Sequence, residues 1–369
     1  MIYDETAHEP LTERPWDPGL VAEAVAGIVA EAEAALDDTT WPVHPLEYEP
    51  GETEDDLRDP ATLYLGSSGM VWALRELGSR LDSAPPADDA LRRYRVRPDF
   101  GDAVPGLYLG EAGILLVLQL VGSEDADVER LRELVVTNER NPTWELFWGS
   151  PGTMVAAREA GLDAECERSA ELLLEQWGDD GLWTQDIAGR RRQMLGPAHG
   201  FAGNVHALRG LVDDDDLRRR IEPPLRRYAV ADGGLVNWPP RVGDDCTRTQ
   251  WCHGAPGIVT TLGDLMPRDL LLGGAELTWH AGPLVKGPGL CHGTAGNGYA
   301  FLRVYTLTGD ELWLDRARRF AMHALEQVDR AGIEHGRGRF SLFTGDVGAA
   351  LFARACVDGD PRFPTMDVW

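Results

Sequence analysis

Two short segments of the chain combine a thiol and an imidazole just ahead of a glycine turn. One reads WCHGAPG and contains Cys252, and the other reads CHGTAG and begins with Cys291 and His292. Zinc prefers such ligands, and three protein ligands leave a fourth position open to water or substrate, as in catalytic zinc sites. Buried free cysteines are the simpler interpretation, but two copies of the same Cys-His-Gly order argue against it. We predict one zinc ion (Zn2+) per chain, bound by these three residues.

His253 follows Cys252 directly, and two roles are open to it. It could be a fourth zinc ligand, or it could face the substrate from beside the metal. Adjacent side chains point in different directions, so a metal bond through Cys252 turns the His253 ring away from the ion. We favour the role beside the metal, facing the substrate.

The elements that must position these residues form a repeat. A Gly-x-x-Gly turn followed by an apolar segment occurs seven times, with first glycines at positions 66, 110, 149, 200, 254, 293 and 345. Amphipathic helical stretches such as residues 164–177 and 311–328 lie between the turns. One such turn is weak evidence, but seven of them indicate a repeat built from an outer helix, a turn and an inner helix. No run of alternating residues predicts strands, so we expect an all-α fold.

This α/α array would place its chemistry at one end. Closed into a ring, it needs no polar end caps, and every inner helix begins on the same side. The turns of Cys252 and Cys291 are then neighbours, and the helix N-termini favour anions such as thiolates or enolates. We expect a single domain overall, in which residues 60–369 form the array. Residues 1–59 are an N-terminal extension with one outer helix at 20–36, and residues 1–19 should lie loosely over the surface.

Composition restricts the partners and the compartment. The net charge is 35 − 61 = −26, which disfavours nucleic acid and anionic lipid and favours neutral or basic polypeptides. Lys286 is the only lysine beside 34 arginines, a balance that fits either a salt-rich cytoplasm or a GC-rich genome. Five cysteines, no signal peptide and no apolar run near the roughly 18 residues of a membrane span predict a cytoplasmic protein with reduced thiols.

The two cysteine turns resemble the signature of the lanthionine synthetase C family, especially its LanC-like branch. Further matches are Asn237-Trp238-Pro239, Tyr299-Ala300-Phe301-Leu302 and Ser341-Leu342-Phe343, so that the resemblance covers about residues 60–355. It implies an α/α toroid of seven inner and seven outer helices. It also implies addition of a cysteine thiol to dehydroalanine or dehydrobutyrine, which gives a thioether. Zinc would lower the pKa of the thiol so that it reacts as a thiolate.

The resemblance also implies roles for four further residues. His199 matches the catalytic histidine of the family and would move the proton, although a helix-capping role is the alternative. Arg248 matches an active-site arginine that could hold the enolate oxygen, and Glu145 stands where bacterial members carry an aspartate and could orient His199. Lys286 stands where LanC-like proteins carry a lysine associated with glutathione, and its ammonium suits a substrate carboxylate or the enolate.

Three functions remain open at this stage. The first is a cyclase that forms lanthionine rings on a dehydrated precursor peptide, with a separate dehydratase preparing that peptide. The second is addition of glutathione or another small thiol to dehydrated residues in proteins. The third is a non-catalytic zinc-containing scaffold that binds peptides or a partner enzyme.

Overall fold

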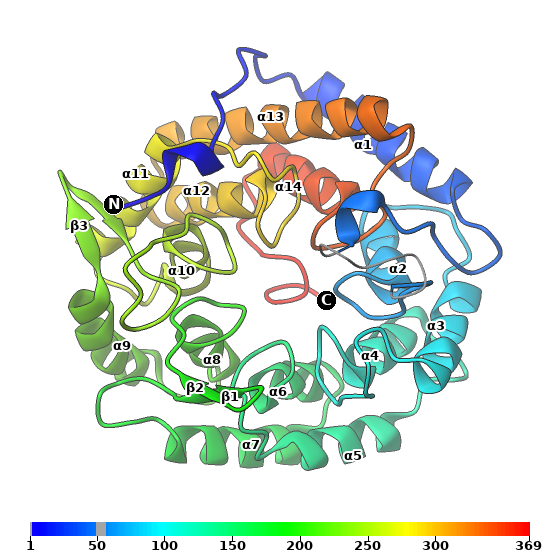
Figure 1. Ribbon diagram of the computed structural model, residues 1–369, viewed down its shortest axis with the longest axis horizontal. Helices are drawn as coiled ribbons and strands as arrows, with labels where there is room; N and C mark the ends of the chain where they lie inside the picture. Colours follow the sequence, from blue (N-terminus) through cyan, green and yellow to red (C-terminus); the bar gives the residue numbers. More distant parts are fainter. Residues whose placement is uncertain (1, 49–56) are drawn as a thin grey trace.

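The chain forms a closed ring of helices in two layers (Figure 1). A computed structural model describes residues 2–48 and 57–369. In this part of the chain, the seven inner helices are α2 (Ser67–Glu76), α4 (Glu111–Val121), α6 (Ser150–Glu159), α8 (Phe201–Ala207), α10 (Ala255–Leu262), α12 (Thr294–Thr308) and α14 (Asp346–Asp358). The seven outer helices are α1 (Pro18–Ala34), α3 (Ala84–Val96), α5 (Val128–Asn138), α7 (Asp163–Glu175), α9 (Asp214–Tyr228), α11 (Arg268–Ala281) and α13 (Glu311–His335). The predicted α/α toroid with seven helices in each layer is confirmed.

The glycine turns start the inner helices for a steric reason. The first glycine of each turn is the N-cap of an inner helix, from Gly66 before α2 to Gly345 before α14. The second glycine lies against the carbonyl oxygen of the residue six positions earlier. A Cβ atom on Gly257 or Gly296 would lie 1.7 Å from such an oxygen. Only a residue without a side chain allows this approach, so the repeat spacing reflects a packing requirement.

The ring closes by pairing the beginning of the chain with its last inner helix. Helix α1 packs on α14 and buries Val21, Ile28 and Ala32. On the same side, the Glu31 carboxylate accepts a hydrogen bond of 2.8 Å from the backbone N–H of Gly338, which precedes α14. The outer helix of the N-terminal extension therefore completes the outer layer.

Specific contacts hold the described part of the N-terminal segment, residues 2–19, which corrects the expectation that residues 1–19 lie loosely; residue 1 lies outside the described residues. The backbone N–H of Glu9 donates to the carbonyl of Pro283 (3.0 Å), and that of Val285 donates to the carbonyl of Ala7 (3.1 Å). The carbonyl of Ile2 accepts a hydrogen bond of 2.8 Å from the Asn237 side chain. These bonds use backbone groups, which every residue possesses, so the polar composition of the segment did not reveal them.

Two short hairpins also correct the expectation that no strands would be found. Strand β1 (Gln185–Ile187) pairs antiparallel with β2 (Arg190–Arg192), and β3 (Val230–Asp232) pairs antiparallel with β4 (Leu235–Asn237). Both connections are two residues long, Ala188-Gly189 and Gly233-Gly234, and all four residues have positive φ. Such turns suit tight hairpins, and they allow pairing where the strand residues themselves do not alternate.

The last residues of the chain lie inside the ring of helices. After α14, residues 360–369 turn back into the centre of the ring (Figure 1). Within the described residues, no helix combines the length and the apolar character that crossing a membrane requires.

Candidate metal and active site

Three predicted ligands come together at the mouth of the fifth and sixth inner helices. One ligand atom from each of Cys252, Cys291 and His292 lies within 4.8 Å of the other two. The backbone N–H of Cys252 donates to the carbonyl of Cys291 (3.0 Å), which joins the two turns directly. Both sulfurs are buried, and the His292 side chain is partly exposed. The cluster is thus closed towards the protein and open on the histidine side.

The ionisation of the two cysteines favours a cation between their sulfur atoms. Burial opposes ionisation of Cys252, but Cys291, His253 and His292 outweigh it and hold the pKa of Cys252 well below its ordinary value. Burial and the neighbouring Cys252 sulfur together raise the pKa of Cys291. Once Cys252 is a thiolate, its charge opposes ionisation of Cys291, unless a cation neutralises both sulfurs. A Cys-Cys-His set with soft sulfur donors therefore fits zinc.

A carboxylate–imidazole pair lies at the neighbouring turn. His199 precedes the N-cap of α8, and its Nδ1 lies 2.9 Å from Glu145 Oε2. The carboxylate is fully buried and also accepts the backbone N–H groups of Phe147 (3.0 Å), Trp148 (2.6 Å) and Gly149 (3.1 Å). Because Glu145 can only accept as a carboxylate, it selects the tautomer of His199 with hydrogen on Nδ1. The Nε2 atom is then the basic nitrogen.

Aromatic rings hold the imidazole of His199 beside the metal turn. Trp148 stacks on it with ring centroids 5.4 Å apart, and Phe147 contacts it edge-on at 4.7 Å. The ring of His253 lies 5.8 Å from that of His199. The Nδ1 of His253 is buried without a hydrogen-bond partner among the described residues, and burial lowers the pKa of His253. His253 therefore lies next to His199 with a lowered pKa, and its Nδ1 has no hydrogen-bond partner among the described residues.

The two predicted cations lie on the exposed side of the site. Arg248 and Lys286 are both exposed. The guanidinium of Arg248 is close enough to contribute to the lowered pKa of His253, and the ammonium of Lys286 counteracts the raised pKa of Cys291. Arg248 therefore acts on the turn of Cys252 and His253, and Lys286 acts on the turn of Cys291.

The sequence analysis missed Tyr64, which belongs to the first turn. Its hydroxyl interacts with the Cys291 thiol, and burial followed by the charge of Cys291 raises the pKa of Tyr64 well above its ordinary value. The Tyr64 ring stacks on the ring of Phe343, with centroids 5.2 Å apart. The backbone carbonyl of Phe343 in turn accepts the backbone N–H of Cys291 (2.9 Å). A signal was present, because Tyr64, Cys252 and Cys291 each stand two residues before the first glycine of a turn.

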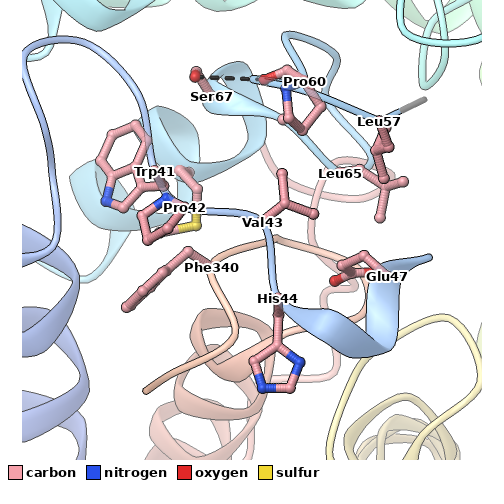
Figure 2. Close-up of a pocket in the computed structure, with 12 residues that line it drawn as sticks. Trp41, Pro42, Val43, His44, Glu47, Leu57, Pro60, Leu65, Ser67 and Phe340 are labelled. Atoms are coloured by element: carbon pink, nitrogen blue, oxygen red, sulfur yellow. Dashed lines mark hydrogen bonds between the residues drawn. The ribbon is translucent and has the colours of Figure 1, made fainter. Parts of the chain in front are cut away.

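A second concave region lies beside the first turn and contains none of the predicted site residues. It is formed by residues 41–47, the start of α2 and Phe340 (Figure 2). Glu47 is held there by hydrogen bonds from Arg339 (2.7 Å), Ser341 (2.7 Å) and Thr344 (2.6 Å). This carboxylate therefore ties the N-terminal extension to the seventh turn.

Comparison with known proteins gives consistent matches. Residues 58–368 match the sequence model of the lanthionine synthetase C-like protein family. The chain is 33% identical over 296 residues to glutathione S-transferase LANCL1 of Danio rerio, covering 70% of this chain and 73% of that protein. It is 32% identical over 189 residues to LanC-like protein GCL1 of Arabidopsis thaliana, covering 47% of this chain and 43% of that protein. Among solved structures, nisin cyclase shares the fold, with a TM-score of 0.60, 16% identity and coverage of 91% and 94% of the two chains.

Proposed function

Because the chain belongs to the lanthionine synthetase C-like family, we propose that it catalyses addition of a thiol to dehydroalanine or dehydrobutyrine in a peptide or protein. One observation carries the proposal: the His199–Glu145 pair lies beside the turn that carries Cys252, because the His199 ring is 5.8 Å from the ring of His253, the residue that follows Cys252. Zinc, held by the three predicted ligands, would supply the lowered pKa that makes a thiol nucleophilic at neutral pH. The same site offers both a place for the nucleophile and a base for its proton.

The protein residues would manage the proton and the developing charge. The sulfur–carbon bond forms at the β-carbon while the carbon–carbon double bond breaks, and the electron pair moves to the carbonyl oxygen as an enolate. Nε2 of His199 accepts the thiol proton and returns a proton to the α-carbon, so that the reaction is balanced. Glu145 keeps the Nδ1 hydrogen of His199 in place, and Arg248 offers a positive charge for the enolate oxygen.

Two thiols are candidates for the nucleophile. A cysteine of the same peptide would give a lanthionine ring, and the enzyme would then be a cyclase acting on a dehydrated precursor. A small thiol such as glutathione would give an intermolecular thioether. Two observations favour the small thiol: the relative from Danio rerio is named a glutathione S-transferase, and Lys286 is an exposed ammonium close to Cys291 that suits a thiol bearing a carboxylate.

The test uses two dehydroalanine peptides with the zinc-loaded protein. The first contains a cysteine, and cyclisation is measured as loss of alkylatable thiol without change in mass. The second lacks cysteine and is incubated with glutathione, so that addition is measured as one glutathione gained. A rate at least about 100-fold above the uncatalysed reaction with either peptide supports the proposal. The His199→Asn variant should lose this rate and retain zinc, whereas an inactive wild type would favour a peptide-binding scaffold.

Metal analysis of the ligand variants tests the site itself. Cys252→Ala and Cys291→Ala should each reduce bound zinc from one ion per chain to well below one. Cys166→Ala is a matched control, because Cys166 is also a buried free cysteine but lies in the outer helix α7. Zinc retained at one per chain in both ligand variants would disprove the assignment.

A further inference from the structure

The segment after α14 fills the centre of the ring next to the metal turns. Phe363, Thr365 and Met366 are almost completely buried, with at most 3% of each side chain exposed. This burial differs from the usual behaviour of segments outside helices and strands, which mostly lie on the surface. The contacts of the segment therefore indicate what it does.

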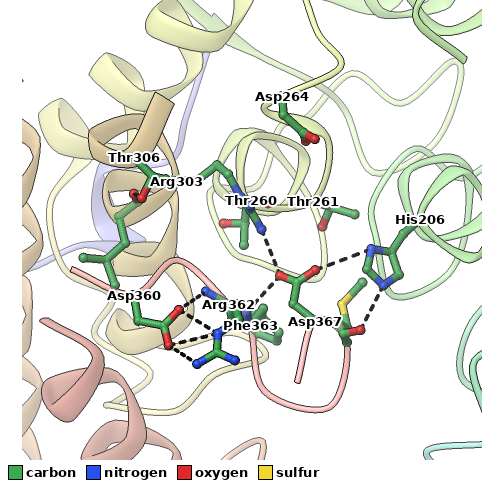
Figure 3. A network of polar contacts seen from close by, with 12 residues as sticks. His206, Thr260, Thr261, Asp264, Arg303, Thr306, Asp360, Arg362, Phe363 and Asp367 are labelled. Carbon is green, nitrogen blue, oxygen red and sulfur yellow. Dashed lines mark hydrogen bonds and ion pairs between the residues drawn. The ribbon is translucent and has the colours of Figure 1, made fainter. Parts of the chain in front are cut away.

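Residues from three different inner repeats hold the segment. The hydroxyl of Tyr108 donates to the carbonyl of Thr365 (2.8 Å), and Nε2 of His206 donates to the carbonyl of Met366 (3.2 Å). The guanidinium of Arg303 donates to Asp367 (2.9 Å), as Figure 3 shows.

The Asp367 carboxylate also holds the backbone of Phe363 in place. Asp367 Oδ2 accepts the backbone N–H of Phe363 (2.9 Å). This bond makes a tight loop of residues 363–367 and thereby orients Phe363 (Figure 3).

Phe363 stacks directly behind a metal ligand. Its ring lies parallel to that of Trp251, with centroids 4.5 Å apart and planes inclined by 4°. Trp251 is fully buried and immediately precedes Cys252. Its indole Nε1 has no hydrogen-bond partner among the described residues. The indole of Trp251 is therefore held by packing and not by a hydrogen bond from its N–H to a described residue, and Phe363 supplies the parallel face of that packing.

The stack also approaches the second sulfur ligand. Trp251 and Phe363 both contact Phe343, with ring centroids 5.9 Å and 6.5 Å away. The carbonyl of Phe343 accepts the backbone N–H of Cys291 (2.9 Å). The three rings thus connect the backbones of the two cysteine turns from inside the ring.

We propose that Phe363 is a positioning residue for the metal site, which acts through Trp251 to hold the Cys252 sulfur at its distance from Cys291 and His292. Asp367 supports this role by holding Phe363. The inference rests on the proposed function in one respect, because it takes these three residues as the zinc ligands. The contacts that support metal ligands commonly change metal affinity by about 10- to 100-fold when they are removed.

The test compares Phe363→Leu, Phe363→Tyr and Asp367→Asn with a matched control. Phe320→Leu removes an equally buried phenylalanine from the outer helix α13, where the ring packs on Phe301 and Trp279. Zinc affinity is measured by competition with a chromogenic chelator. Phe363→Leu should weaken zinc binding at least about tenfold, and Asp367→Asn should weaken it less. Phe363→Tyr should bind zinc as the wild type does, because tyrosine keeps the stacked ring. Phe320→Leu should bind zinc as the wild type does.

A second readout does not need the metal. In the zinc-free protein, alkylation of each cysteine by iodoacetamide is followed by peptide mass spectrometry. Phe363→Leu should accelerate alkylation of Cys252 at least about fivefold and leave Cys356, which is buried in α14, unchanged. Equal acceleration of Cys356, or zinc affinity and Cys252 reactivity like those of the wild type, would overturn the proposal. Failure of the wild type to bind zinc, with the Cys252 effect present, would instead overturn the metal assignment.

Discussion

Most residues at the centre of the candidate site occupy two equivalent positions in successive turns. Directly before the first glycine of turns three to six stand Trp148, His199, His253 and His292. One position earlier in each of the seven turns stand Tyr64, Tyr108, Phe147, Ala198, Cys252, Cys291 and Phe343. The second set is mostly aromatic or sulfur-containing, and the rings of its four aromatic members pack on one another. The two cysteines that we propose as metal ligands are therefore variants of a position that is otherwise mostly aromatic.

The Glu145–His199 pair gives a prediction at this scale. Glu145→Gln keeps the size of the side chain, but the amide has one acceptor oxygen for the four donors that the carboxylate serves. The hold on the Nδ1 hydrogen of His199 weakens, and kcat for thiol addition should fall about 10- to 100-fold with zinc content unchanged. Steady-state kinetics together with metal analysis check this. An unchanged kcat would show that Glu145 only supports the turn.

At the scale of elements, the first residue of α14 carries a charge that the fold opposes. Asp346 is buried, and its Oδ2 accepts the backbone N–H of Arg339 (2.7 Å). Burial raises the pKa of Asp346 to about 7 and the charges of Glu31 and Glu47 add to this, although the hydrogen bond from Arg339 acts against it. The unfolded chain releases this proton near its ordinary value of 3.8. Ionisation therefore costs stability progressively as the pH rises from about 4 to about 7.

Asp346→Asn should remove this cost. The amide oxygen can accept the same hydrogen bond without a charge, so the variant should be more stable than the wild type at pH 8, by on the order of 2 kcal/mol. The gain should shrink as the pH falls below 7 and disappear near pH 4. Urea unfolding at several pH values measures it. A gain that is the same at every pH would mean that charge is not the cause.

Local signals explain which elements could be predicted from the sequence. The inner helices were predictable because close backbone packing requires glycine at Gly257 and at the equivalent position of every repeat. The β1–β2 hairpin was not, because residues 190–192 are all arginine and show no alternation. That Cys252, Cys291 and His292 come together could be predicted because cysteine and histidine are rare and stand at equivalent positions of two repeats. The Phe363–Trp251 stack joins residues 112 positions apart, and no local pattern reveals such a pair.

At the scale of the whole molecule, the charge of −26 acts against compactness. Acidic groups in a folded chain repel each other more than in an expanded one, and salt shortens the range of that repulsion from about 10 Å at 0.1 M to about 3 Å at 1 M. The melting temperature should therefore rise by roughly 4 °C or more between about 0.1 and 1 M KCl. The rise should diminish towards pH 4.6, the isoelectric point. A melting temperature that falls with salt would show that the surface ion pairs outweigh the repulsion.

The pairing of α1 with α14 also orders events during synthesis. Glu31 and Gly338 are 307 positions apart, so α1 leaves the ribosome long before its partner exists. Until then the face that carries Val21, Ile28 and Ala32 has nothing to cover it, and closing so large a loop is slow. Helix α1 is therefore made well before α14 but buried only with it, and nascent chains that stall before α14 should be the ones that chaperones retain.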